Sequence, residues 1–292
     1  MGVVCCLPPL LEHLLTRPDV TDVLVNGGTD IWVEADGVLH RAGSLAPGEI
    51  EASLERVLAP LGRRLDRLSP SIDARLPDGT RICAVVPPIA TDGPAVALRV
   101  LRHRRCDIAD FVDDPLVERE VIDLVASRAN ILVSGATGAG KTTLIAAITD
   151  SIRHSERLIV LEDTKEILTT HPHCLRLEAR PPTPDGRGEV TLDDLLRTAL
   201  RLRPDRLVLG EIRDREAITL LNALNTGHSG SLASIHANSA ADARRRLELL
   251  VTRLVPGILT ARELVTTAID VVVHVTRGTD GRRRIVDIAR TS

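Results

Sequence analysis

A glycine-rich segment in the middle of the chain carries the residues best suited to bind phosphate. Gly135 is followed by four residues and then by Gly140, Lys141 and Thr142, which matches the P-loop pattern G-x-x-x-x-G-K-[ST]. The glycines of such a loop permit a tight turn whose backbone N–H groups point at phosphate oxygens, and the next helix adds its positive end. The lysine then bridges the β- and γ-phosphates, and the hydroxyl that follows it can ligate Mg²⁺. The candidate ATP-binding residues of the segment are Gly135, Ala136, Thr137, Gly138, Ala139, Gly140, Lys141, Thr142 and Thr143.

The sequence on either side of this segment has the pattern that the motif requires. An apolar run at 131–133 precedes it, as expected of a buried parallel strand, and an apolar helical pattern at 144–148 follows it. The alternative is a glycine-rich turn that precedes a lysine by chance. Because Lys141 and Lys165 are the only lysines in the chain, a chance match at this position is less frequent still. We therefore predict that ATP binds at this loop with Mg²⁺.

Three apolar runs after the loop each end in a side chain that nucleotide hydrolysis can use. These side chains are Glu162 with Asp163, Glu211, and His236, with His228 upstream of the third run. In an open α/β sheet, ligands bind at the carboxyl ends of the strands, so we expect these groups along one sheet edge. A carboxylate at that edge holds Mg²⁺ through water or orients the attacking water.

Each of these residues also has a structural interpretation. An acidic residue after a strand often caps the next helix, and a single histidine is more often structural. Three such strand ends downstream of a phosphate-binding loop favour the functional interpretation. Our candidate catalytic residues are Glu211, Glu162, Lys141, His228 and His236, and our candidate Mg²⁺ ligands are Thr142, Glu211 and Asp163.

A site that cleaves a phosphate bond also needs positive charge, which is often an arginine supplied by another subunit. Arg75 and Arg81 lie on the two sides of one predicted hairpin turn, and Arg99 follows in a later strand. The alternative for each is an ordinary surface arginine. We predict that these three arginines contact ATP, which implies either closure of one domain over the nucleotide or a ring of subunits.

The hydrophobic pattern predicts two domains. Residues 1–105 combine short alternating strands with two helical segments, which is typical of an α+β unit. Residues 115–292 alternate helical patterns with fully apolar strands, which predicts an α/β domain with a parallel-rich, doubly wound sheet. We expect the acidic stretch 106–114 to be a hinge and the proline-rich stretch 180–189 to be a loop. The strands expected in the second domain span 130–134, 157–161, 206–209, 231–235 and 271–275.

Composition limits the class of protein further. Apolar residues make up 43% of the chain but aromatic residues only 1%, so leucine, valine, isoleucine and alanine must build the cores. A net charge of −3 provides no general attraction to nucleic acid, and the arginine clusters at 99–105, 244–246 and 282–284 are typical of solvated faces. Five cysteines without C-x-x-C spacing favour neither a zinc site nor a disulfide framework. We expect a cytoplasmic protein with no transmembrane segment, no cleavable leader and no specific nucleic-acid partner.

Four segments in order resemble the superfamily of type II and type IV secretion ATPases. They correspond to its Walker A motif, its Asp box, its Walker B motif ending in glutamate and its His box, at 135–143, 159–163, 203–211 and 226–238. Three further segments, at 20–27, 73–81 and 180–190, are similar to the tight-adherence (Flp) pilus branch of that superfamily. The chain departs from the family pattern at 213–215, where Arg-Asp-Arg replaces the usual Arg-Gly. The resemblance covers about residues 20 to 290.

The resemblance implies a hexameric ATPase at the inner face of the plasma membrane. Its PAS-like N-terminal domain and RecA-like, P-loop C-terminal domain would bind ATP between them and act on an inner-membrane platform protein. Glu211, with Glu162, would position water and Mg²⁺. The implied function is ATP hydrolysis that powers pilus assembly or protein secretion. The alternatives are a conjugal-transfer or type IV secretion ATPase that moves DNA or protein, and a nucleotide-gated scaffold with little hydrolysis.

Overall fold

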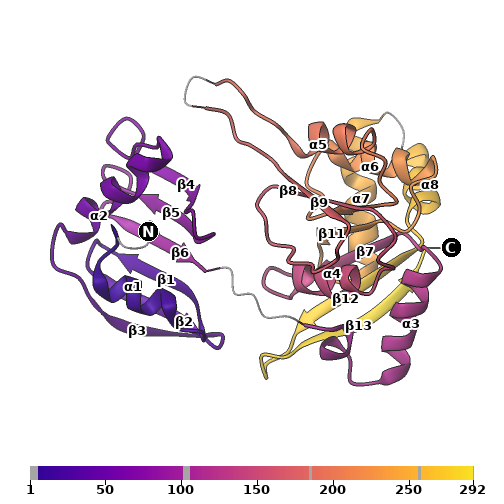
Figure 1. Cartoon of the computed structure of the whole chain (residues 1–292), viewed down its shortest axis with the longest axis horizontal. Helices are drawn as coiled ribbons and strands as arrows, with labels where there is room; N and C mark the ends of the chain where they lie inside the picture. Colours follow the sequence, from indigo (N-terminus) through magenta and orange to yellow (C-terminus); the bar gives the residue numbers. More distant parts are fainter. Residues whose placement is uncertain (1–5, 101–105, 184–185, 256–257, 292) are drawn as a thin grey trace. The chain divides into compact units, whose positions relative to one another are not determined.

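The structure is a computed structural model, and it describes residues 6–100, 106–183, 186–255 and 258–291. The chain divides into two compact units, Met1–Arg104 and Arg105–Ser292 (Figure 1). Each unit has its own hydrophobic core, made mainly of leucine, valine, isoleucine and alanine. Among the described residues, no helix combines the length and the apolar character needed to cross a membrane.

The first unit is built on an antiparallel sheet of six strands in the order β3-β2-β1-β6-β5-β4. Its two helices pack in the same hydrophobic core as the inward-facing residues of the strands. The turn at Asp36-Gly37, between β2 and β3, has positive φ at both residues, 50° and 82°, which is the geometry of tight hairpin turns. The elements are α1 (Pro9–Thr16), β1 (Val20–Asn26), β2 (Asp30–Ala35), β3 (Val38–Ser44), α2 (Glu49–Leu58), η2 (Ala59–Leu61), β4 (Ser71–Arg75), β5 (Arg81–Val85) and β6 (Ala95–Arg99).

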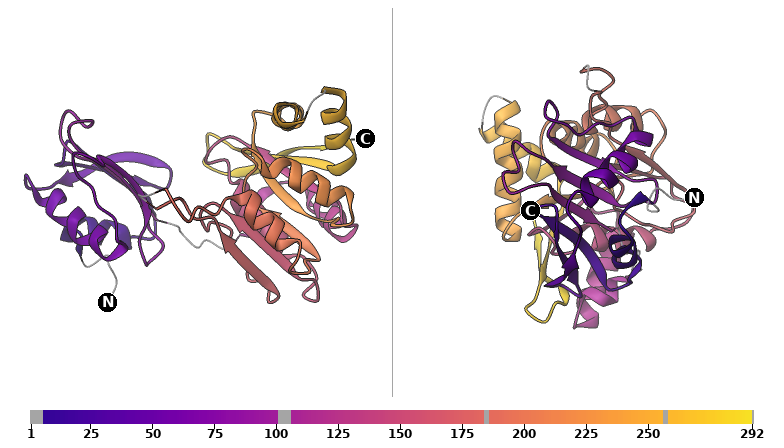
Figure 2. Two further views of the ribbon diagram at one scale, coloured as in Figure 1. Left: turned by 90° about the horizontal axis from the view of Figure 1, so that it is seen from above. Right: turned by 90° about the vertical axis from the view of Figure 1, so that its left-hand side faces the viewer.

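The second unit is built on a sheet of seven strands in the order β13-β12-β7-β11-β10-β8-β9. All neighbouring pairs are parallel except β12 and β13, which form the antiparallel hairpin drawn in yellow in Figure 2. The elements are η3 (Ile108–Phe111), α3 (Pro115–Ala126), β7 (Ile131–Gly135), α4 (Lys141–Asp150), β8 (Leu158–Glu162), β9 (Cys174–Glu178), α5 (Leu192–Ala199), β10 (Arg206–Leu209), α6 (Glu216–Asn225), β11 (Leu232–His236), α7 (Ala240–Leu254), α8 (Ile258–Ala268), β12 (Val271–Arg277) and β13 (Arg283–Arg290).

Helices cover both faces of this sheet, which explains why its central strands read as continuous apolar runs. Residues of α5 to α8 form one hydrophobic cluster with one face, and residues of η3, α3 and α4 form a second cluster with the other. In β8, for example, Ile159 and Leu161 belong to the first cluster, whereas Leu158 and Val160 belong to the second. The parallel-rich α/β sheet expected from the sequence is confirmed.

The segment 106–114, which we expected to be a hinge, belongs to the second unit. Ile108 and Phe111 are 5% and 1% exposed, and they pack in the core beside α3 and α4. The acidic residues around them have local partners, since Asp107 and Asp110 form a capping box at the N-terminus of η3. An acidic composition therefore marks helix caps here and not a linker.

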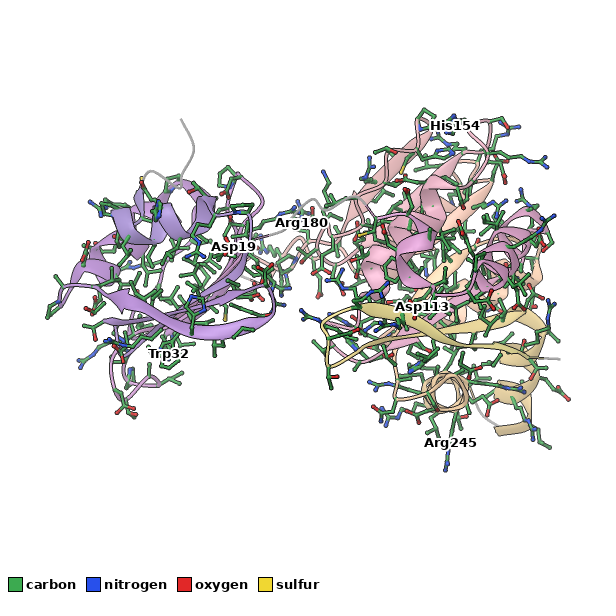
Figure 3. The ribbon with its side chains drawn as sticks, turned by 90° about the horizontal axis from the view of Figure 1, so that it is seen from below. Asp19, Trp32, Asp113, His154, Arg180 and Arg245 are labelled. Atoms are coloured by element: carbon green, nitrogen blue, oxygen red, sulfur yellow. The ribbon has the colours of Figure 1, made fainter. Side chains whose placement is uncertain are left out.

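Two strands of the second unit, β9 and β13, lie outside the five strands that the apolar runs predict. Both are edge strands with partly exposed side chains, so neither has the continuous apolar pattern of a buried strand. The proline-rich stretch 180–189 is a loop as expected among its described residues, and Arg180 pairs with Val190 at its base. Arg180 is labelled in Figure 3.

Candidate nucleotide-binding site

The phosphate-binding motif lies between β7, which ends at Gly135, and α4, which begins at Lys141. Gly138 and Gly140 adopt positive φ angles of 74° and 102°, a conformation that other L-residues rarely adopt. A Cβ atom on Gly140 would also lie 2.5 Å from Cδ of Arg283, so the position excludes a side chain on two grounds. The loop therefore has the strand-turn-helix geometry that directs backbone N–H groups and the helix N-terminus toward an anion.

Lys141 is folded back onto its own loop. Its Nζ donates to the carbonyl oxygens of Gly135 and Ala136, both at 3.1 Å, and to Nδ1 of His236 at 2.9 Å. The residue is 7% exposed, and this burial lowers the pKa of the ammonium, while the charge of Glu211 opposes the shift. All three acceptors are neutral, so a phosphate oxygen would be a stronger partner for this lysine than any of them.

His236 connects the lysine to a carboxylate. Because an ammonium has only protons to give, Nδ1 of His236 accepts from Lys141 and Nε2 carries the ring proton. Nε2 lies 3.1 Å from Oε1 of Glu211 and donates to it. Burial, followed by the charge of Lys141, lowers the pKa of His236, which favours the neutral ring that this arrangement needs.

The chain of contacts continues through Arg213, which sequence reasoning did not include among the site residues. Its Nη2 lies 2.7 Å from Oε2 of Glu211, and its Nη1 lies 3.1 Å from Oδ2 of Asp163. The structure thus brings together two of the three candidate Mg²⁺ ligands, and the third, Thr142, follows Lys141 in the first turn of α4. Arg213 stands two residues after Glu211, on the same side of the strand end, and this spacing was the signal in the sequence that could have identified it.

Glu162 lies at the same sheet edge but is turned inward. It is 4% exposed, and its Oε1 accepts from the backbone N–H groups of Glu166 at 2.8 Å and Ile167 at 2.7 Å. Desolvation raises its pKa to about 7, although the two N–H donors oppose that shift. Glu162 therefore anchors the loop after β8, the loop that begins with Asp163.

His228 lies at the opposite edge of the sheet. It precedes the amino end of β11, whereas His236 is the last residue of that strand and pairs with Gly135. Nδ1 and the backbone N of His228 lie 3.3 Å and 3.2 Å from the carbonyl oxygen of Ala223, near the end of α6. The structure does not bring His228 to the Lys141 cluster, because the length of β11 separates the two histidines.

The three candidate arginines of the first unit form a row across three strands. Arg75 in β4 is directly opposite Arg81 in β5, and Arg81 is directly opposite Arg99 in β6. Ion pairs hold two of them, Arg81 to Asp73 at 2.6 Å and Arg99 to Asp22 at 2.8 Å. The carboxylates of Asp73 and Asp22 offset the charge of two of these guanidinium groups.

Comparisons with known proteins agree with this architecture. The sequence profile of the family described as type II/IV secretion system protein matches residues 9–289. A putative conjugal transfer protein of Mycobacterium tuberculosis is 39% identical over 292 aligned residues, covering 96% of this chain and 83% of the relative. The conjugal transfer protein TrbB of Rhizobium radiobacter is 35% identical, covering 90% of this chain and 81% of the relative.

A solved structure shares both units. The VirB11 ATPase of the Brucella suis type IV secretion system, crystallised with sulphate, is 28% identical and covers 99% of this chain and 94% of its own, with a TM-score of 0.52. The predicted RecA-like fold of the second unit is confirmed by this likeness. The comparisons do not single out the tight-adherence branch within the superfamily. The chain belongs to the type II/IV secretion system protein family, the superfamily of secretion ATPases that its four sequence boxes predict.

Proposed function

We propose that this chain is a motor ATPase that binds ATP at the 135–143 loop and hydrolyses it to drive a conjugal-transfer or type IV secretion machine. The observation that carries the proposal is the unbroken chain of contacts from Lys141 through His236 to Glu211 at the edge of that loop. Such a chain joins a phosphate-binding cation to a carboxylate that can act on water. A glycine-rich turn with a purely structural role does not require contacts between a lysine and a carboxylate.

The loop binds the phosphates with groups that are already positioned. The backbone N–H groups of the loop and the N-terminus of α4 point toward the anion, and the positive φ at Gly138 and Gly140 permits this. Lys141 exchanges its three neutral acceptors for phosphate oxygens, which gives stronger, charge-assisted hydrogen bonds. Binding is favoured because the lysine gains charged partners, while the carbonyl oxygen of Gly135 keeps the backbone N–H of Ala237 as a donor at 3.3 Å.

Glu211 orients the attacking water and accepts its proton. Its carboxylate is only 18% exposed, and the Nε2 proton of His236 and the guanidinium of Arg213 hold its two oxygens in place. When Lys141 moves to phosphate, Nδ1 of His236 loses its donor, and the imidazole keeps its bond to Glu211 through Nε2. The lysine and the carboxylate are thereby coupled, so hydrolysis responds to whether phosphate is present.

Thr142, Glu211 and Asp163 would hold Mg²⁺, which when bound neutralises charge on the β- and γ-phosphates. The donor set fits, since a hydroxyl and two carboxylates are hard oxygen ligands. The carboxylates of Glu211 and Asp163 already share one cation, the guanidinium of Arg213. Among the described residues, no group of three His, Cys, Asp or Glu side chains could hold a metal ion.

The relatives indicate which kind of machine the ATPase drives. Two relatives that cover most of this chain are named for conjugal transfer, and VirB11 belongs to a type IV secretion system. The net charge of −3 provides no general attraction to DNA, and in our proposal the ATPase acts through a membrane partner on the cytoplasmic side. A second candidate is pilus assembly, which the three tight-adherence-like segments favour. Deleting the gene in its source organism separates the two, through loss of DNA transfer or loss of surface pilin.

A ring of six subunits is part of the proposal, with Arg75, Arg81 and Arg99 as phosphate contacts. The test is the ATPase rate against protein concentration, with light scattering for mass on the same samples. We expect specific activity to rise steeply as oligomers form, because a site completed by a neighbouring subunit is incomplete in a monomer. A flat rate from monomers would contradict the ring.

Glu211→Gln tests the chemical step. We expect this variant to retain ATP binding and to lose turnover by about 100-fold or more, since the amide cannot accept the proton of water. Glu263→Gln on the exposed side of α8 makes the same chemical change away from the site and should keep the full rate. A full rate in Glu211→Gln would place the catalytic carboxylate elsewhere.

A further inference from the structure

The β12–β13 hairpin packs against the phosphate-binding loop at several points. In β12, Nδ1 of His274 lies 2.8 Å from Oγ of Ser134, the residue before the loop. The carbonyl oxygen of Val275 lies 2.4 Å from the position that a Cβ of Gly135 would occupy. The backbone of the hairpin thus approaches the loop as closely as a glycine permits, and it carries the start of β13 to the same place.

Arg283, the first residue of β13, extends along the loop. Its Nη1 donates to Oγ1 of Thr143 at 3.1 Å, in the first turn of α4. Its Cδ lies 2.5 Å from the position of a Cβ on Gly140, and its Nε lies 3.1 Å from the same point. A guanidinium is therefore held against the end of the loop from which α4 begins.

The neighbours of Arg283 in the same arginine cluster have a different role. Arg284 pairs with Asp280 at 2.7 Å and with Asp113 at 2.8 Å, and Arg282 lies 3.4 Å from Asp113. Asp113, labelled in Figure 3, lies beside the β13 ribbon. Arg282 and Arg284 both lie near Asp113, whereas Arg283 donates to Thr143 in α4. The cluster 282–284 is thus divided between a structural ion-pair group and one arginine at the loop.

The position of Arg283 relative to the hydrolysis residues determines which part of a nucleotide it can reach. Strand β7, which leads into the loop, lies between β12 and β11 in the sheet. His236 and the carboxylates come from β11, β10 and β8, on one side of the loop, whereas Arg283 comes from the β12–β13 side. The γ-phosphate belongs beside Lys141 and Glu211, so the β12–β13 side receives the other end of the phosphate chain.

We propose that Arg283 is a nucleotide-binding residue that contacts the α-phosphate end of the bound nucleotide from within the same chain. This inference rests on the proposed function, because it assumes that the loop binds a nucleotide. Thr143 orients the guanidinium, and Gly140 leaves the space that it occupies. Since ADP and ATP share the α-phosphate, Arg283 contributes equally to the binding of both and does not contribute to the cleavage step.

The test is the affinity of the full chain for ADP and for ATP, measured by titration with fluorescent analogues. We expect Arg283→Ala to weaken both by the same factor, about tenfold or more, the size of one charge-assisted hydrogen bond. In steady-state hydrolysis, KM should rise by that factor while kcat stays within about twofold. Arg282→Ala removes the same charge from the neighbouring position and should leave both affinities unchanged.

Two further variants separate phosphate contact from support of the loop. Arg283→Gln keeps a donor for Thr143 but has no charge, and Arg283→Lys keeps the charge on a flexible stem. A phosphate contact predicts that the lysine variant binds ADP better than the glutamine variant, with equal thermal midpoints in the absence of nucleotide. A purely structural role predicts the reverse order, and that result would overturn the inference. If the unaltered chain bound no ADP or ATP, the proposed function would fail. Unchanged ADP affinity in Arg283→Ala would refute only the role of Arg283.

Discussion

The two edges of the parallel sheet in the second unit are both rich in charge, but they are built differently. At the amino edge, Arg206 is 2% exposed and donates to both carboxylate oxygens of Glu156, at 2.8 Å and 2.9 Å. The same guanidinium donates to the carbonyl oxygens of Val125 at 3.0 Å and Gly230 at 3.3 Å. Arg128 also donates to Glu156, and its second nitrogen donates to the backbone of the neighbouring loops.

The carboxyl edge has fewer backbone partners and more access to solvent. A series of side-chain contacts extends from Lys141 through His236 and Glu211 to Arg213, whose side chain is 60% exposed, while Lys141 also donates to two backbone carbonyl oxygens of its own loop. A ligand can replace one contact in this chain without leaving a buried group unpaired, whereas at the amino edge it cannot. A buried ion pair fixed to backbone therefore indicates structure at the amino edge, and a side-chain network that can rearrange beside the loop indicates function at the carboxyl edge.

Lys141→Ala should produce the largest effect on activity and almost none on stability. We expect loss of nucleotide binding and hydrolysis by about 1000-fold or more, since several charge-assisted contacts to phosphate disappear together. Burial of the ammonium lowers its pKa, so its removal relieves a desolvation cost and the thermal midpoint should stay equal or rise. ATPase assays and thermal unfolding check the two halves, and near-normal hydrolysis would contradict the assignment of the loop.

Arg206→Met should show the opposite pattern at the other edge. Removing Arg206 leaves Glu156 with Arg128 as its remaining cationic partner. It also takes a buried donor from the carbonyl oxygens of Val125 and Gly230, so we expect a loss of about 3 kcal/mol in stability. The double variant Arg206→Met with Glu156→Leu should recover much of it, because no uncompensated charge remains buried. Thermal unfolding gives the stability, and the affinity for ADP of the folded fraction should stay unchanged. A specific loss of ADP binding without loss of stability would remove the contrast between the edges.

Glu162→Gln tests an intermediate case, a carboxyl group of the functional edge that is buried like a structural one. Its pKa is raised to about 7 in the folded chain, from 4.5, so the folded state binds more protons between those values and its stability falls as pH rises through that window. Glutamine keeps the oxygen that accepts from Glu166 and Ile167 without the charge. The variant should therefore be more stable than the original chain at pH 8, by up to about 3 kcal/mol, and similar at pH 4.5.

Thermal midpoints at the two pH values check this prediction, with Glu263→Gln as the exposed control that should show no pH-dependent gain. An equal difference between Glu162→Gln and the original chain at both pH values would mean that the carboxyl group is not desolvated in solution.

The parts of the site that the sequence predicts are those encoded by local pattern. The loop from Gly135 to Thr143 is a continuous motif, and Glu211 and His236 follow apolar strands that must end at one sheet edge. We counted His228 among the catalytic candidates, although a residue before a parallel strand belongs to the opposite edge. That rule was available and separates the two histidines without a structure.

The remaining residues depend on contacts that no local pattern records. Arg283 meets Thr143 across 140 positions of sequence, and Arg213 meets Asp163 across 50. An arginine has the same appearance in the sequence whether it pairs with an aspartate or lies against a phosphate-binding loop. In the segment 106–114, by contrast, the three-residue spacing of Ile108 and Phe111 indicated a helical turn, and the acidic composition concealed it.

The smallest effects are expected from replacing each of the two histidines by glutamine. His236→Gln should reduce turnover by about tenfold, because Glu211 loses the imidazole donor that fixes its orientation. The affinity for ATP should stay unchanged or rise, because Lys141 then has one fewer hydrogen bond to break when it moves to phosphate. His228→Gln should leave turnover unchanged and cost about 1 kcal/mol in stability, the contribution of one hydrogen bond near the end of α6. Steady-state rates and thermal midpoints of both variants give the four numbers needed. Since the substitution is the same, a shared loss of turnover would mean that the chemistry extends to the amino edge, and the separation of function and structure along β11 would have to be abandoned.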